Sequence, residues 1–103
     1  MKIYLIILFI SILSSHDGHN GNHSHSDNGI ISGFVLDSQT KMPIEYVSVS
    51  VSFIESEKIV SGAISDSNGY FYIDKLGFGD YKLKVEYIGY ENYLIPFISI
   101  NHK

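Results

Sequence analysis

Hydrophobic and polar residues alternate along most of the chain between Ile30 and Ile100. This period of two is typical of strands that bury one face and leave the other in water. The pattern is clearest from Glu45 to Phe53, where valines alternate with serines. The side chains of this strand that we expect to face the core are Val47, Val49, Val51 and Phe53.

The alternation predicts six strands, separated by short polar or glycine-containing segments. In the third strand we expect Val60 and Ile64 to point inward. Pro96 interrupts the last strand, which predicts an edge position or a bulge there, because proline has no N–H for a sheet ladder. The predicted strands are Ile30–Asp37, Glu45–Phe53, Lys58–Ser65, Tyr70–Asp74, Tyr81–Tyr87 and Tyr93–Ile100.

The segments between the strands carry turn residues. Asp37–Pro43 is a polar connection that ends in proline, and Ser67–Gly69 can place Asn68 or Gly69 at positive φ. Gly77–Asp80 turns the chain again. With no sustained helical period, the pattern predicts an all-β domain over residues 30–100, a small antiparallel sandwich of six to seven strands.

The first 15 residues differ from this domain and resemble a secretory signal peptide. Lys2 precedes an apolar run from Ile3 to Leu13 that only Ser11 interrupts. A helix needs about 20 apolar residues to span a bilayer, so this run is too short to do so. Ser14 and Ser15 offer small residues for cleavage, with an uncleaved anchor as the alternative. A buried first strand is disfavoured, because a polar tract follows at once.

Residues 16–29 form a low-complexity segment (HDGHNGNHSHSDNG), which we expect to be a flexible linker because it has no apolar surface to bury. Imidazoles suit zinc and copper, and a flexible chain can wrap several of them round one ion. The segment is therefore a candidate metal-capturing tract, although a solvated linker without a metal role fits it too. The candidate ligands are His16, His19, His23 and His25.

Composition narrows the functional classes. The formal net charge is −4 and no basic stripe exists, which argues against nucleic acid as a partner. The chain has no cysteine, so it has neither disulfides nor thiolate chemistry. Between Ile30 and Ile100 there is also no histidine, so a serine nucleophile would lack its base. We expect no enzyme, no catalytic residue and no required cofactor.

Several separated pieces of the domain occur in the order found in a known family. Together they resemble the carboxypeptidase regulatory-like domain, a non-catalytic companion domain with a prealbumin-like or Ig-like sandwich fold. The resemblance runs from Ile30 to about Ile98. The matching pieces are Ile31–Asp37 (ISGFVLD), Pro43–Ile44, Val47–Val49, Ser65–Phe71 (SDSNGYF), Leu76, Gly79–Tyr81 and Val85–Tyr90 (VEYIGY).

The closing VEYIGY run is similar to the copy found at the N-terminus of TonB-dependent outer-membrane receptors of the Bacteroidetes type. The resemblance implies an exported protein of the periplasm or outer membrane, or a secreted one, whose partners are envelope proteins or a receptor plug and barrel. Lys41 stands where the family often has glycine, and Glu45-Tyr46 where Gly-Ala is frequent. Because a plug would begin near Lys103, a receptor fragment and a free-standing module that binds carbohydrate or protein both stay open.

Two further patterns suggest binding. Asp66–Gly69 resembles part of a calcium loop, but the further oxygen ligands and the downstream bidentate carboxylate of a complete loop are not evident, so we interpret it as a plain turn. Tyr46, Tyr70 and Tyr72 are candidates for an exposed sugar- or protein-binding face. Cross-strand pairing that stabilises the sheet is the simpler interpretation of these tyrosines.

Overall fold

The computed structural model describes residues 5–14 and 29–101. These residues form antiparallel strands and no helix, so none of them belongs to a helix that could cross a membrane. The predicted all-β class is therefore confirmed. The strands are β1 (Leu5–Ser14), β2 (Gly29–Asp37), β3 (Ser48–Phe53), β4 (Ile59–Ile64), β5 (Tyr70–Leu76), β6 (Gly79–Glu86) and β7 (Tyr93–Ile100).

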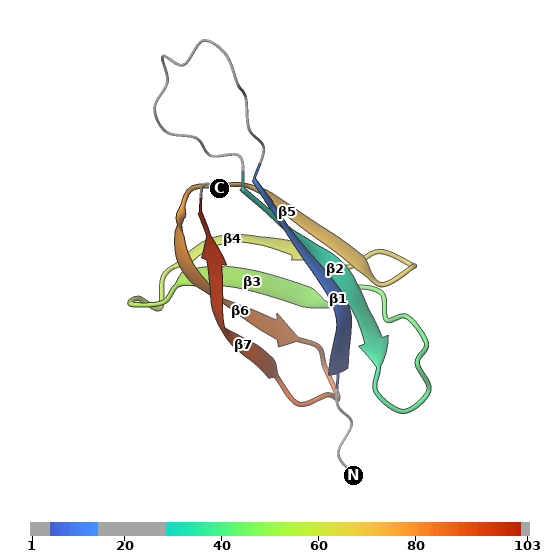
Figure 1. Ribbon diagram of the computed structural model, residues 1–103. Helices are drawn as coiled ribbons and strands as arrows, with labels where there is room; N and C mark the ends of the chain where they lie inside the picture. Colours follow the sequence, from blue (N-terminus) through green and yellow to red (C-terminus); the bar gives the residue numbers. More distant parts are fainter. Residues whose placement is uncertain (1–4, 15–28, 102–103) are drawn as a thin grey trace.

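The strands make two sheets that pack face to face (Figure 1). One sheet has the order β1-β2-β5 and the other the order β4-β3-β6-β7. Along one margin β4 lies near β5, and along the other β1 lies near β7. The sequence pattern predicted strands but not this pairing order, which brings together segments far apart along the chain.

Alternate side chains fill the space between the sheets, as the pattern predicts. Val47, Val49 and Val51 are at most 1% exposed, and the serines between them face outward. Burying each such side chain contributes about 1.5–3 kcal/mol. The remaining core residues are Ile31, Val35, Ile44, Phe71, Ile73, Leu76, Tyr81, Leu83, Val85, Ile98 and Ile100.

The prediction for the third strand is wrong about which face is buried. Val60 and Ile64 are 37% and 59% exposed, whereas Ala63 packs against the core and Ser65 is 2% exposed. Two tertiary features set this parity. Ser65 is held inward by buried hydrogen bonds, and Val60 is an extra residue in the pairing with β3. A slip of one residue moves every side chain to the other face.

The second strand is shorter than predicted. It begins at Ser48 because Glu45 and Tyr46 form a turn, in which Tyr46 has a φ of 69°. Phe53, expected in the core, is 44% exposed at the strand end. Its ring stacks on Tyr81 with centroids 5.3 Å apart, so the aromatic residue covers the margin of the core instead of filling it.

The predictions for the last strand and the central turn are confirmed. β7 is an edge strand, and it carries one extra residue near Pro96: Tyr81 pairs with Ile98, while Leu83 pairs with Ile95. Gly69 has a φ of 77°, and a Cβ atom there would lie 2.5 Å from the carbonyl oxygen of Val35. Only glycine avoids both the strain and the clash.

The segment interpreted as the apolar part of a signal peptide forms β1. It pairs antiparallel with β2 from Leu5 opposite Asp37 to Ser14 opposite Gly29. The polar tract that follows this segment argued against a strand here, yet a continuous apolar run also suits a strand. Export and cleavage remain predictions, because pairing in the full-length chain says nothing about what happens to a leader during secretion.

Candidate functional site

The carboxylate of Asp66 holds the turn that leads into β5. Its Oδ1 atom accepts hydrogen bonds from the backbone N–H groups of Asn68, at 2.8 Å, and Tyr70, at 3.0 Å. The Gly69 N–H donates to the Asp66 carbonyl at 2.8 Å. This is a side-chain-stabilised turn. The interpretation of the calcium-like motif as a plain turn therefore agrees with its hydrogen bonding.

A second carboxylate joins two loops at one end of the sandwich. Asp37 Oδ1 accepts from the N–H groups of Gln39 and Thr40, and its Oδ2 accepts from the Tyr90 hydroxyl at 2.7 Å. The Thr40 backbone bond, followed by the Tyr90 bond, lowers the pKa of Asp37 below its ordinary value. The same pair raises the pKa of Tyr90. Such bonds stabilise the ionised carboxylate, as expected for a structural link.

The described residues do not assemble a metal centre. No group of three His, Cys, Asp or Glu within the described residues could hold a metal ion. The candidate metal ligands His16, His19, His23 and His25 lie outside the described residues, as does His102.

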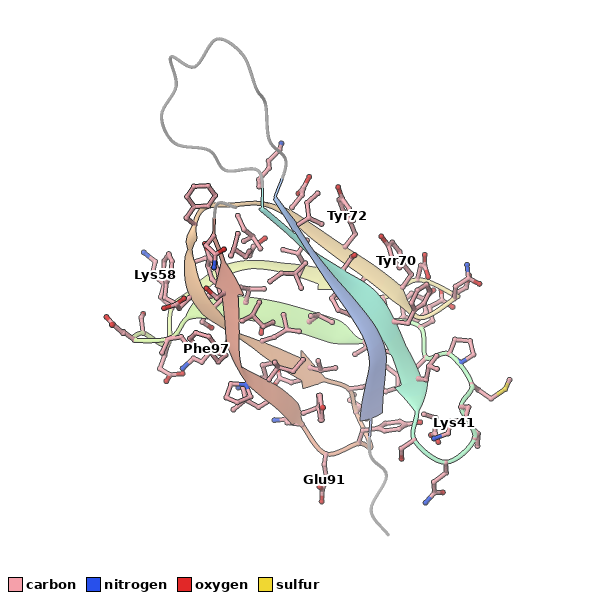
Figure 2. The ribbon with its side chains drawn as sticks, in the orientation of Figure 1. Lys41, Lys58, Tyr70, Tyr72, Glu91 and Phe97 are labelled. Atoms are coloured by element: carbon pink, nitrogen blue, oxygen red, sulfur yellow. The ribbon has the colours of Figure 1, made fainter. Side chains whose placement is uncertain are left out.

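Aromatic side chains line the outer face of the three-stranded sheet. Phe34 of β2 lies opposite Tyr70 of β5, with ring centroids 5.2 Å apart. The Tyr70 and Tyr72 centroids are 6.5 Å apart, and Figure 2 shows both pointing away from the other sheet. Tyr46, which the sequence grouped with them, lies on the other sheet's side in the turn before β3. The structure thus adds Phe34 to this surface and removes Tyr46.

The outer face of the four-stranded sheet is polar along its two central strands, β3 and β6. Serines of β3 pair with the charged row of β6, so that Ser50 lies opposite Lys84 and Ser52 opposite Lys82. Lys82 makes an ion pair with Glu57 at 3.1 Å. A hollow of about 270 Å³ lies over these rows. Its lining is Ser50, Ser52, Glu57, Ile59, Lys82, Lys84, Glu86 and Leu94.

A second hollow, of about 510 Å³, lies at the end of the same sheet. Its most unusual member is Ile88, which is 92% exposed at the tip of the β6–β7 turn beside Gly89, whose φ is 89°. Ile88 was not among the candidates predicted from the sequence, although an apolar residue beside glycine in a turn could have indicated it. The lining residues are Tyr46, Ser48, Glu86, Tyr87, Ile88 and Asn92.

Two packed antiparallel sheets, turn-bound carboxylates and open surface hollows define a small Ig-like β-sandwich module. Residues 31–101 match the CarboxypepD_reg-like domain, and the chain belongs to this family. The resemblance found in the sequence is therefore confirmed. The family is one of regulatory Ig-like domains and not of catalytic ones. No curated protein matches the chain, and no solved structure does.

Proposed function

We propose that this chain is exported and works as a non-catalytic interaction module at the cell envelope, as the N-terminal part of a TonB-dependent receptor-like protein. The observation that carries the proposal is the CarboxypepD_reg-like sandwich that follows an apolar, leader-like segment. The fold supports a binding role because its interior is filled by side chains, leaving the outer faces and loops for contacts.

Export is tested by expressing the full-length chain in an export-competent bacterium, fractionating the cells and measuring the intact mass. The expected result is an envelope or periplasmic protein that has lost about the first 15 residues. Leu8→Arg breaks the apolar run and should leave an unprocessed chain in the cytoplasm. A wild-type chain that stays in the cytoplasm at its full 11.6 kDa would contradict export.

Receptor membership is tested in the genome. A plug and barrel encoded downstream of Lys103, in frame or just past a frameshift, supports it. A stop codon followed by an unrelated gene supports the alternative, a free-standing secreted sandwich that binds carbohydrate or protein. The aromatic row of Phe34, Tyr70 and Tyr72 favours that alternative, because exposed rings stack on sugars. A glycan array with wild type and Tyr72→Ala tests it: signals that require Tyr72 would support sugar binding.

Metal capture by the histidine tract is a second proposed role, carried by four histidines within ten positions of the sequence. Calorimetric titration with zinc and with copper should give heat that is lost when His16, His19, His23 and His25 are all changed to alanine. Binding should fail below about pH 6, where the imidazoles are protonated. Equal heats from the two proteins would remove this role.

A further inference from the structure

β2 is the middle strand of its sheet, and it would become an edge strand if β1 were removed. It runs for nine residues without proline, and its only charged residue is the last one, Asp37. In its pairing with β1, the extra residue is on β1: Ile7 lies opposite Val35 and Phe9 opposite Phe34. A strand of this kind, if left unpaired, is a template for pairing with another chain.

The described sheets have four edge strands, and the three other than β1 differ from β2 in this respect. β7 carries Pro96 and an extra residue, and β4 has only six residues with Val60 extra. β5 has an extra residue in its pairing with β2, where Lys75 adopts a φ of 60°. Bulges, prolines, charges and short length are devices that blunt an edge. Apart from the charge of Asp37 at its end, β2 has none of them, which suits an inner strand.

β1 covers the edge of β2, and β1 is part of the leader segment that we expect to be removed during export. β1 pairs with β2 along its whole length and lies near β7 of the opposite sheet (Figure 1). The family match begins at Ile31, within β2, so β1 lies outside the family's domain. Cleavage after Ser14 or Ser15 would therefore remove β1 and leave β2 as a regular, open edge.

The backbone direction of β2 identifies the groups that would be freed. The Val35 N–H donates to Gly69 on the β5 side, at 2.8 Å. Successive residues of a strand turn their N–H and C=O groups to opposite neighbours. The backbone groups of Ser32 and Phe34 therefore face β1. Without β1, these donors and acceptors would lack their strand partner.

We propose that, in the exported protein, the open edge of β2 binds an extended apolar segment of another polypeptide as an added antiparallel strand. This inference rests on the proposed export and specifies the kind of partner for the interaction module. The occupant's chemistry is taken from the segment seated there in the full chain, which is apolar apart from two serines. Pairing of this type supplies main-chain hydrogen bonds, and alternate side chains give specificity.

A second copy of the domain would replace only part of what β1 provides at this site. The second copy would offer its own β2 as the pairing strand. The inward side chains of that β2, Ile31 and Val35, are already buried under the second copy's four-stranded sheet. That strand could not also lie along β7 of the first copy, where β1 lies. An extended segment outside any folded sheet has no such obstacle.

The test uses the processed protein, purified from an export-competent bacterium after its intact mass has been measured. The probe is a fluorescein-labelled peptide containing residues 5–14 flanked by two lysines at each end, followed by fluorescence anisotropy. We expect saturable binding. Ser32→Pro, which removes an N–H aimed at the open edge, should weaken binding at least about tenfold, whereas Ser32→Ala should change it less than about twofold.

Amide hydrogen exchange gives a measurement that does not depend on the folding of a variant. In the wild-type protein, the amides of Ser32 and Phe34 should exchange quickly alone and become protected when the peptide is added. A processed protein that binds no peptide, or binds it without protecting these amides, would overturn the edge proposal and leave export standing. A chain that reaches the envelope with its leader attached would overturn the edge proposal but not export, and a chain that stays in the cytoplasm would overturn both. A concentration-dependent dimer protected at Ser32 and Phe34 would replace the extended segment with a second copy.

Discussion

The hydroxyl group of Ser65, which lies between β4 and β5, binds the segment before β3. Its Oγ atom donates to the Ile44 carbonyl at 2.7 Å and accepts from the Val47 N–H at 2.9 Å. Both partners are buried, and they lie 21 and 18 residues away along the chain. The sequence motif marked this region as a turn, but nothing in the local pattern could reveal partners so far away.

We expect Ser65→Ala to lower the free energy of unfolding by about 1–3 kcal/mol, because it leaves a buried carbonyl and a buried N–H without a partner. Urea denaturation measures the change. Ser50→Ala on the outer face of β3 is the matched control and should change stability by less than about 0.5 kcal/mol. Equal effects of the two substitutions would show that the buried hydroxyl does not stabilise the fold.

The Asp37–Tyr90 hydrogen bond predicts a pH dependence. The pKa of Asp37 is below its ordinary value of 3.8 in the folded chain, so its stabilising contribution is present above that value. The contribution is lost as the pH falls through the lowered pKa. Tyr90→Phe removes one cause of the lowering, and the variant should therefore lose less stability than wild type between about pH 7 and pH 2.

Chemical denaturation at several pH values measures this difference. Tyr72→Phe, on the exposed face of β5, is the control and should follow the wild-type profile. A Tyr90→Phe profile identical to wild type would show that the bond to Asp37 does not survive in solution.

At the scale of elements, β4 is the strand whose buried face differs from the one that the sequence pattern predicted. Its apolar residues Ile59, Val60 and Ile64 face solvent, while the small residues Ser61 and Ala63 face the opposite way. Period-two alternation shows that a strand has two faces, but it does not say which face is buried when both contain small or apolar residues. For β3 the valine and serine faces differ strongly, so the prediction that Val47, Val49 and Val51 face the core was correct.

This arrangement predicts unequal effects of two substitutions. Ile64→Thr should change the free energy of unfolding by less than about 0.5 kcal/mol, because Ile64 is 59% exposed. Val49→Ala, on the neighbouring strand and 1% exposed, should lower it by about 2 kcal/mol through lost burial and a cavity. Urea midpoints measure both. A large loss for Ile64→Thr would mean that β4 has the predicted parity after all.

At the scale of the whole molecule, one core shared by two sheets holds the domain without any disulfide, since the chain has no cysteine. Leu83 lies near its centre, fully buried on β6 between β3 and β7. Domains of this kind have a total stability of about 5–15 kcal/mol. Losing one central side chain is therefore a large fraction of the total.

Leu83→Ala should lower the free energy of unfolding by about 2–5 kcal/mol. Its neighbour Lys84 points to the outer face and is the matched control, with an expected change under about 0.5 kcal/mol for Lys84→Ala. Thermal and urea unfolding followed by circular dichroism measure both variants. Similar losses would contradict the inward and outward alternation of β6.

The sequence by itself determined that the chain after residue 29 makes short strands, where five of them begin and end to within two residues, and where Gly69 turns the chain. These properties follow from alternation and backbone sterics within a few residues. Only the tertiary structure decided the strand order, the buried face of β4, the hydrogen bonds of Ser65 to Ile44 and Val47, and the hydrogen bond between Asp37 and Tyr90. Each of these depends on which segments far apart in the sequence become neighbours, and the local pattern of residues does not predict that.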